Sequence, residues 1–117
     1  MMAACSHDDE LSLTLTGDYL EATTWDATVT VKLDDLMVTE SRFVLEFLSK
    51  DSGTCKDTYH EGSYYAGNFK YSITKEMIFF SGSIVGNWTV IERKKDKIVL
   101  RAFLPEENIM TLNKMSN

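Results

Sequence analysis

Hydrophobic and polar residues alternate along most of the chain, the pattern of β-strands with one buried face. β-branched and aromatic residues are frequent in these segments, as strand propensity requires. One further segment, Met77 to Phe80, is continuously apolar and predicts a strand buried on both faces. No segment shows a comparable helical period. The alternating segments span residues 11–16, 27–33, 43–47, 69–74, 88–91, 98–103 and 110–114.

Short polar connections separate these segments. Lys50 to Gly53 predicts a hairpin loop, because Asp accepts local backbone hydrogen bonds and Gly53 tolerates a positive φ. Tight turns are also expected at 74–76, at 94–97 and at 105–108. The charges of 94–97 are interpreted as a solvated turn rather than a binding patch.

Two stretches leave alternatives open. Asp34 to Arg42 is compatible with a short helix or with a strand crossover. Glu61 to Asn68 contains two glycines and is expected to form a longer loop.

The whole pattern predicts a single all-β domain, an antiparallel meander of about eight strands that can close into a barrel. Closing such a sheet removes its exposed edges. With 117 residues, 44% of them hydrophobic, the chain is long enough for one core and too short for two. We therefore expect a tail over residues 1–10 and the barrel domain over 11–117.

Charge narrows the range of partners. The net charge is −6, from 12 basic and 18 acidic residues, without a basic cluster. This composition argues against binding to a nucleic acid or to an anionic lipid surface. No apolar run approaches the roughly 20 residues of a transmembrane helix.

The N-terminal residues suggest where in the cell the protein is located. Met2 to Ser6, with small residues before Cys5, is similar to the end of a bacterial lipoprotein signal, and a polar tether follows it. On this interpretation Cys5 is the lipidated residue, and the start of the chain is truncated. The alternatives are an accidental match, a free thiol, or a link between Cys5 and Cys55.

The order of motifs resembles that of the small lipocalin-like (calycin-type) domains of Bacteroidetes envelope lipoproteins. This resemblance implies an eight-stranded barrel or half-barrel in the periplasm or at the cell surface, but it does not imply one activity. The motifs that carry it are Gly17-Asp18-Tyr19 in an early strand, the strand-turn-strand unit Leu45 to Thr54, the strands Phe69 to Ile73 and Met77 to Phe80, the pair Trp88-Thr89-Val90 and Ile98-Val99-Leu100, and the final Leu112-Asn113-Lys114.

Catalytic chemistry has little support in the sequence. His60 lies near Asp57 and Glu61, but within a regular strand these two carboxylates cannot both flank its ring. There is no Gly-x-Ser-x-Gly motif, phosphate-binding glycine loop or calcium loop. We therefore expect a protein that is not an enzyme and has no cofactor or metal.

Two binding modes are left. The preferred one is non-catalytic binding of a small apolar or amphipathic ligand inside the barrel. Its alternative is a protein-interaction module with a filled core, acting as a periplasmic inhibitor or an accessory subunit of a surface complex. For that mode Tyr64 and Tyr65, in the loop 62–67, are the candidate contacts. The candidate ligand-lining residues are Tyr19, Trp25, Phe69, Tyr71 and Trp88.

Overall fold

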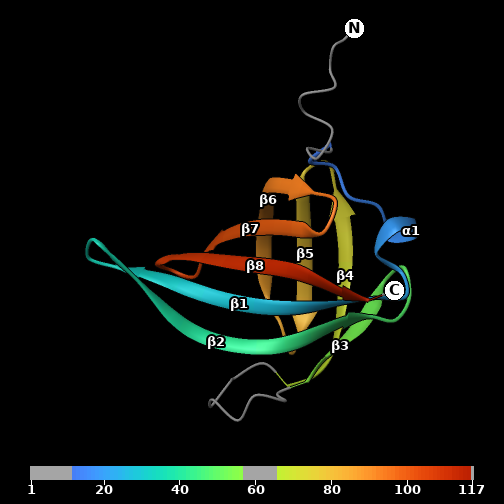
Figure 1. Cartoon of the computed structure of the whole chain (residues 1–117), viewed down its shortest axis with the longest axis horizontal. Coiled ribbons are helices and arrows are strands. Elements are labelled where there is room, and N and C mark those ends of the chain that lie inside the picture. The colour runs from blue at the N-terminus through green and yellow to red at the C-terminus, as the bar shows by residue number, and fades with distance from the viewer. Residues whose placement is uncertain (1–11, 57–65, 117) are drawn as a thin grey trace, which may run out of the picture.

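The protein is a closed antiparallel barrel of eight strands, in which each strand pairs with the next and the last pairs with the first (Figure 1). The computed structural model describes residues 12–56 and 66–116. The prediction of an all-β meander is confirmed, and the sheet is a closed barrel rather than a half-barrel. The elements are α1 (Gly17–Leu20), β1 (Thr23–Leu33), β2 (Leu36–Phe47), β3 (Ser52–Lys56), β4 (Gly67–Thr74), β5 (Met77–Gly82), β6 (Gly86–Lys94), β7 (Lys97–Phe103) and β8 (Glu107–Ser116).

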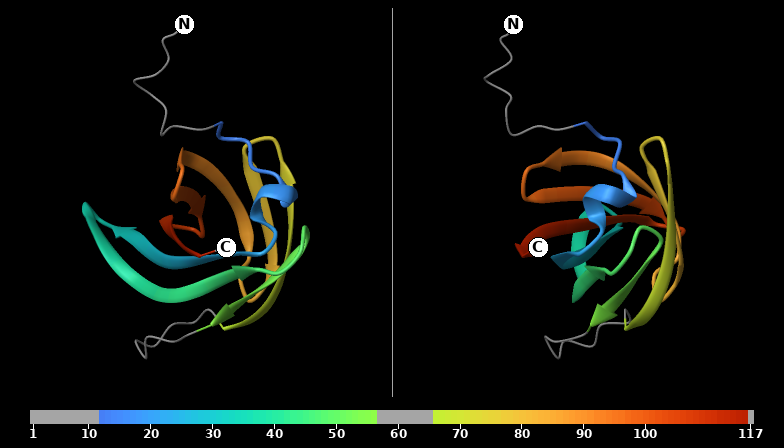
Figure 2. Two further views of the ribbon diagram at one scale, coloured as in Figure 1. Left: turned by 45° about the vertical axis from the view of Figure 1, so that its right-hand side comes forward. Right: turned by 90° about the vertical axis from the view of Figure 1, so that its right-hand side faces the viewer.

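The up-and-down order gives the barrel two different ends (Figure 2). The helix end carries α1 together with the turns β2–β3, β4–β5 and β6–β7. The hairpin end carries the β1–β2 turn and the loops β5–β6 and β7–β8. The polar turns expected at 74–76, 94–97 and 105–108 lie between strands or at their ends, as predicted, and a bend at 49–51 joins β2 to β3. Gly53 was expected in that loop with a positive φ, but it lies within β3 and is not among the positive-φ glycines.

Side chains fill the barrel interior. Trp25 and Trp88 are completely buried, and they belong to one continuous cluster of buried apolar residues. At the helix end the cluster includes Leu15 and Leu20, which precede and end α1. At the hairpin end it includes Ile84 from the β5–β6 loop. Residues from outside the strands therefore close the core at both ends, which gives the close packing expected of a protein interior.

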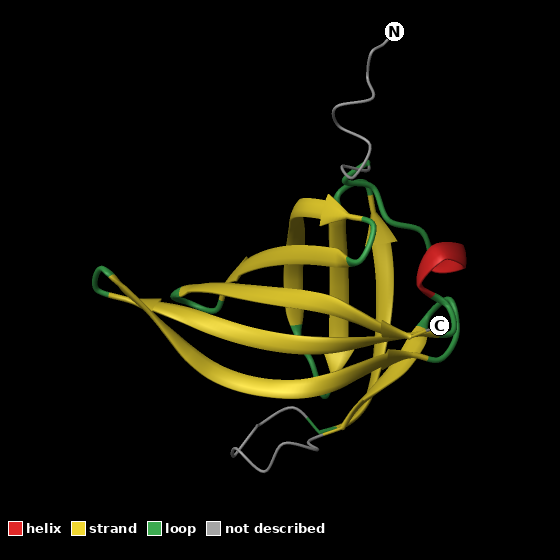
Figure 3. Cartoon of the chain, in the orientation of Figure 1, coloured by secondary structure: helices red, strands yellow, loops and turns green. Residues whose placement is uncertain are grey.

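The N-terminal segment differs from expectation. Leu11 to Thr16 was expected to form a strand, and Gly17 to Tyr19 to lie in one, but residues 12–16 are irregular and 17–20 form α1 (Figure 3). Thr16 starts the helix, because its side chain accepts a hydrogen bond from the Tyr19 backbone N–H at 3.1 Å. One helical turn places Leu20 over the core, where a continued strand would have pointed it along the wall.

The stretch from Asp34 to Arg42 is neither a helix nor a crossover. Asp34 and Asp35 form a tight turn between β1 and β2, and Asp34 has a positive φ of 57°. Asp tolerates this conformation better than most residues, which makes it suitable for a two-residue hairpin turn. The rest of the stretch belongs to β2 and pairs with β1, with Leu33 opposite Leu36.

The prediction that Met77 to Phe80 is buried on both faces is wrong. Ile78 and Phe80 point into the core, whereas Met77 and Phe79 are exposed on the outer wall. A fully buried strand needs a second layer on its outer face. Among the described residues, no second layer of helices covers the outside of this barrel (Figure 3).

Candidate functional site

Four of the five predicted ligand-lining residues meet in the interior. Trp25, Phe69, Tyr71 and Trp88 all belong to the buried cluster. The indole N–H of Trp25 donates to the Thr23 hydroxyl at 2.8 Å, and that of Trp88 donates to the Val85 carbonyl at 3.0 Å. Both polar groups are thus satisfied by the barrel itself, as buried polar groups must be.

The other two candidate residues in the interior, Phe69 and Tyr71, pack against neighbouring aromatic rings. Phe69 and Tyr71 make edge contacts with Phe47, with ring centroids 5.7 Å and 5.0 Å apart, and Phe69 makes another with Phe80 at 5.4 Å. These are favourable edge-to-face geometries. The arrangement accounts for the four aromatics as core, and their role in lining a ligand site stays a prediction.

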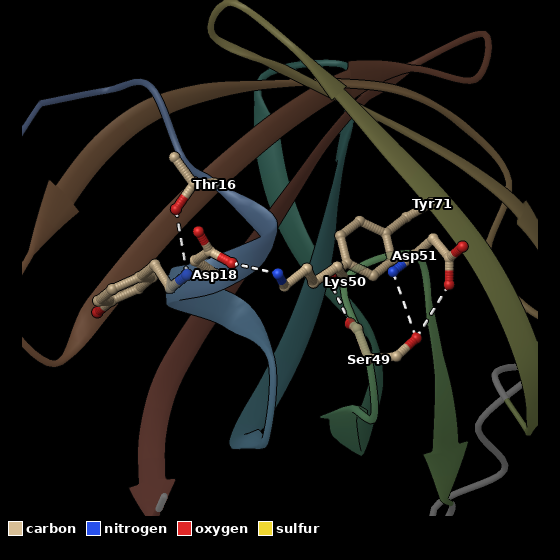
Figure 4. Close-up of polar contacts among 7 residues, drawn as sticks. Thr16, Asp18, Ser49, Lys50, Asp51 and Tyr71 are labelled. Carbon is tan, nitrogen blue, oxygen red and sulfur yellow. Dashed lines mark hydrogen bonds and ion pairs between the residues drawn. The ribbon is translucent and has the colours of Figure 1, made fainter.

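Tyr71 also anchors a loop. Its hydroxyl donates to the Ser49 carbonyl at 2.7 Å, which ties β4 to the β2–β3 loop (Figure 4). Burial, with added repulsion from the charges of Asp51 and Glu21, raises the pKa of Tyr71 to about 12. The phenol is therefore a neutral donor at physiological pH.

Tyr19, the fifth candidate, lies outside the interior. It is half-buried at the helix end. The Arg93 guanidinium lies 4.4 Å from the centre of its ring, and the Lys114 ammonium lies 5.5 Å away. The Tyr19 hydroxyl reaches the Lys95 carbonyl at 3.4 Å. This residue therefore fastens α1 to β6 and β8 through cation–π contacts, and it packs against the outside of the buried cluster that contains the other four.

A hollow of about 460 Å³ lies beside α1 and has a mixed polar and apolar lining. Figure 4 shows the polar contacts around it. The Lys50 ammonium contacts the Asp18 carboxylate at 2.8 Å. The hydrogen bond and the charge of Asp18 raise the pKa of Lys50. Nearby, the Ser49 hydroxyl donates to Asp51 at 3.0 Å. Because these groups pair with one another, the cluster joins α1 to the β2–β3 loop rather than offering unpaired groups to a ligand.

No catalytic constellation is assembled by the part of the chain that the structure describes. Cys55 is a free, buried thiol, and burial raises its pKa to about 11, against a smaller opposing effect of the hydrogen bond from Ser83. Such a thiol is a poor nucleophile. His60 lies outside the described residues, as do Tyr64, Tyr65 and Cys5.

Within 12–56 and 66–116, no three His, Cys, Asp or Glu residues are grouped so that they could hold a metal ion. None of the helices described there is long and apolar enough to span a membrane.

The most distinctive surface is the end of the β1–β2 hairpin, which projects from the barrel (Figures 1 and 3). Strand β8 pairs with β1 only as far as Val31, and β3 pairs with β2 only from Val44 onward. Residues 31–41 therefore form the end of a two-stranded ribbon, in which β1 beyond Val31 pairs with β2 alone among the described residues, and the described part of β3 ends at Lys56, opposite Val44. We call this ribbon the arm.

One face of the arm is apolar. The residues of β1 that point into the barrel are the odd-numbered ones, and this face continues outward through the pairs Val31–Val38 and Leu33–Leu36. Exposure rises along it, from 6% at Val31 to 44% at Val38, 47% at Leu33 and 69% at Leu36. We call these four residues the apolar strip, and it extends the core surface beyond the core.

Neighbouring loops add to the apolar character of the hairpin end. Val85, Phe103 and Leu104 are exposed, and the Leu104 side chain lies against Gly86, where an added Cβ would meet it at 3.0 Å. The β7–β8 loop thus lies against the start of β6. Exposed patches of this kind are a mark of interaction sites.

This end also carries acidic side chains. Asp34 and Asp35 at the tip of the arm and Glu106 in the β7–β8 loop are exposed. None of the ion pairs between described residues includes them. Their charge is therefore available to a basic partner.

This surface was not predicted from the sequence. Its signal was present as the spacing of Val31, Leu33, Leu36 and Val38, which continues an inward-facing series on both sides of a turn. Recognising it required knowing that Asp34 and Asp35 form that turn.

Comparisons of the chain with models of known protein families, with characterised proteins and with solved structures gave no significant match. The resemblance to lipocalin-like domains therefore stays a prediction.

Proposed function

We propose that this domain is a non-catalytic protein-interaction module that binds its partner through the apolar strip of the arm. The carrying observation is that the strip continues the inward face of β1 and β2 past the point where the barrel covers it. The interior aromatics also support this proposal, because their rings pack against one another.

Energetics favour a partner on the strip. A two-stranded ribbon is at best marginally stable in water unless an apolar face is covered. Burying a Leu side chain that is otherwise exposed contributes about 1.5–3 kcal/mol. Because Leu33 and Leu36 are 47% and 69% exposed, much of this burial free energy is still available when a partner binds. A partner that covers them would gain this free energy and would fix the arm at the same time.

The outer wall gives a useful contrast. Met77 and Phe79 are also exposed, but they lie on β5 within the continuous wall of the barrel. β5 is paired with a neighbouring strand on both sides and, unlike the arm, does not extend beyond the barrel wall. Scattered exposed apolar side chains of this kind are common on monomeric proteins. They therefore make a matched control for the arm.

The test uses the tagged chain, expressed in the organism that makes it, with bound proteins quantified by mass spectrometry. We compare the wild type with Leu33→Ser/Leu36→Ser and with Met77→Ser/Phe79→Ser. We expect one protein to be recovered in near-stoichiometric amount with the wild type and the β5 variant, and to fall at least tenfold with the arm variant. Equal recovery with all three chains would contradict the proposal.

Binding of a small apolar or amphipathic molecule is the second candidate. Ser41 favours it, because its buried hydroxyl lies on the strand between the core and the arm without a hydrogen-bond partner among the described residues. An amphipathic ligand could supply that partner. Native mass spectrometry separates the candidates, since a stoichiometric small-molecule adduct that is lost on denaturation would favour the ligand.

The cellular location of the protein is part of the same proposal. We propose that the domain is exported and lipid-anchored through Cys5 in a bacterial envelope. The described chain begins at Ser12, close to the helix end, and the arm projects from the opposite end of the strands. An anchor before Ser12 would leave the arm accessible. Metabolic labelling with a radioactive fatty acid tests this, because Cys5→Ser should abolish incorporation.

A further inference from the structure

We propose that the tip of the arm inserts into an apolar groove of a partner protein, in which lysine or arginine side chains pair with Asp34 and Asp35. The tip is the turn Asp34-Asp35 together with Leu33 and Leu36, which precede and follow it. This inference rests on the proposed function and names the chemistry of the partner's surface.

The shape of the arm supports insertion. The β1–β2 turn is the outermost point of the ribbon, and it projects from the barrel (Figure 1). Leu33 and Leu36 lie opposite each other directly behind this turn, and Val31 and Val38 form the next pair toward the barrel. A groove would bury these paired side chains more completely than a flat surface would, because its walls also reach around the tip.

The tip also carries negative charge. Asp34 and Asp35 are exposed and, like Glu106 in the β7–β8 loop, belong to no ion pair among the described residues. Glu106 lies beside the start of the arm, because β8 pairs with β1 up to Asn108, which is opposite Val31. The outer end of the apolar strip is therefore bordered by three acidic side chains.

The order of residues links this charge to the apolar contact. Asp34 and Asp35 separate Leu33 from Leu36 by one tight turn, so a partner that covers both leucines must also approach both acids. An ionised carboxylate that loses its water without gaining a new partner is strongly unfavourable. Lysine or arginine in the groove would replace that water with charge-assisted hydrogen bonds. We therefore expect a groove that is apolar where it meets the leucines and basic at its end.

Two other occupants fit this tip less well. A symmetric contact between two arms would bring Asp34 and Asp35 of both copies together, and like charges in close apposition are unfavourable. A membrane would cover the leucines with hydrocarbon, which offers the aspartates no partner. Lys32 is the one basic residue in the sequence of the arm, and it lies on the face opposite the apolar strip, so it does not neutralise the tip.

The test uses the tagged full chain in the organism that makes it, with bound proteins quantified at low and at high salt. Asp34→Asn/Asp35→Asn removes the charge of the tip and keeps its shape, since Asn tolerates the positive φ of residue 34 as Asp does. We expect the partner recovered with the wild type to fall at least fivefold with this variant at low salt. High salt should lower recovery with the wild type at least fivefold and with the variant less than twofold.

Glu76→Gln/Asp96→Gln is the matched control. It removes the same amount of charge from two exposed acids in the β4–β5 and β6–β7 turns, which also belong to no ion pair among the described residues. We expect this variant to change recovery of the partner less than twofold. Equal loss with both variants would overturn the proposal, because it would indicate attraction to the overall charge of the chain.

Amide hydrogen exchange locates the contact. The recovered partner, once purified, should slow exchange of the amides of residues 31–38 in the full chain and leave those of β5 unchanged. Binding without that protection would overturn insertion of the arm. An arm-dependent dimer in analytical ultracentrifugation, or arm-dependent binding to phosphatidylcholine vesicles, would overturn the choice of occupant in favour of a second copy or of a membrane.

These failures are distinguishable from failure of the proposed function. If the partner is lost with Leu33→Ser/Leu36→Ser but recovered equally with the wild type and with Asp34→Asn/Asp35→Asn, then the interaction module stands and the basic groove is wrong. If recovery of no cellular protein depends on the arm, both proposals are wrong.

Discussion

Leu33 and Leu36 face each other across the β1–β2 turn, on the face of the ribbon that points into the barrel elsewhere, and yet both are largely exposed. The same face of β1 and β2 contains Ala27 and Phe43, which are completely buried. One continuous surface thus serves as core at one end and as accessible surface at the other.

This relationship predicts a contrast in stability. Leu33→Ser/Leu36→Ser should lower the free energy of unfolding by about 1–2 kcal/mol, because the two side chains are 47% and 69% exposed and are only partly buried. Leu45→Ala, on the same strand but fully buried, should cost about 2–5 kcal/mol. Urea unfolding of the three proteins measures both values. A large loss in the arm variant would mean that the strip is part of the core.

The strands could be predicted because a sheet with one buried face forces alternation. Ala27 to Leu33 and Phe43 to Phe47 alternate strictly, and both segments belong to strands as expected. The turn between these two segments could not be recognised from the spacing of the apolar residues around it. Leu33 and Leu36 are three residues apart, as neighbours on a helix are, so the pattern left a helix open.

Exposure was the harder property to predict. Alternation shows which residues share a face but not whether another element covers that face. Ile78 and Phe79 are both apolar, yet the first is buried and the second lies on an uncovered outer wall. The position of Tyr19 was missed for a related reason, since a helix of four residues is too short to show a period.

Cys55 should be unreactive in the folded protein. Burial raises its pKa to about 11, so the thiolate is scarce at pH 8. In a Cys5→Ser background, we expect modification of Cys55 by a chromogenic disulfide reagent to be at least a hundredfold slower in buffer than in concentrated urea. Rapid modification in buffer would show that the barrel opens readily near β3.

Gly53 is required by close packing. A Cβ at this position would overlap the Glu46 carbonyl oxygen and the Phe69 ring. Gly53→Ala should therefore destabilise the barrel by about 2 kcal/mol or more, as overpacking does. Gly67→Ala is the comparison, because an added Cβ there meets nothing closer than 3.8 Å and is disfavoured mainly by a φ of 120°. Thermal unfolding should rank Gly53→Ala as the less stable variant.

Tyr71 should make the barrel sensitive to alkaline pH. Its pKa in the folded protein is raised to about 12, above the value of 10.0 for an unperturbed tyrosine. Between these values the unfolded chain releases the phenolic proton and the folded chain retains it. Stability from this group is therefore fully present below about pH 10 and is lost as pH rises toward 12.

Tyr71→Phe isolates this contribution. The variant loses the hydrogen bond to the Ser49 carbonyl, which should cost about 1 kcal/mol at pH 8. It cannot titrate at this position, so the difference in unfolding free energy between wild type and variant should shrink between pH 10 and 12. Urea unfolding at pH 8, 10 and 11 measures that difference, and Tyr19→Phe serves as the control, since its phenol lies outside the core. A constant difference across this range would show that the Tyr71 phenol ionises as readily in the folded chain as in the unfolded one.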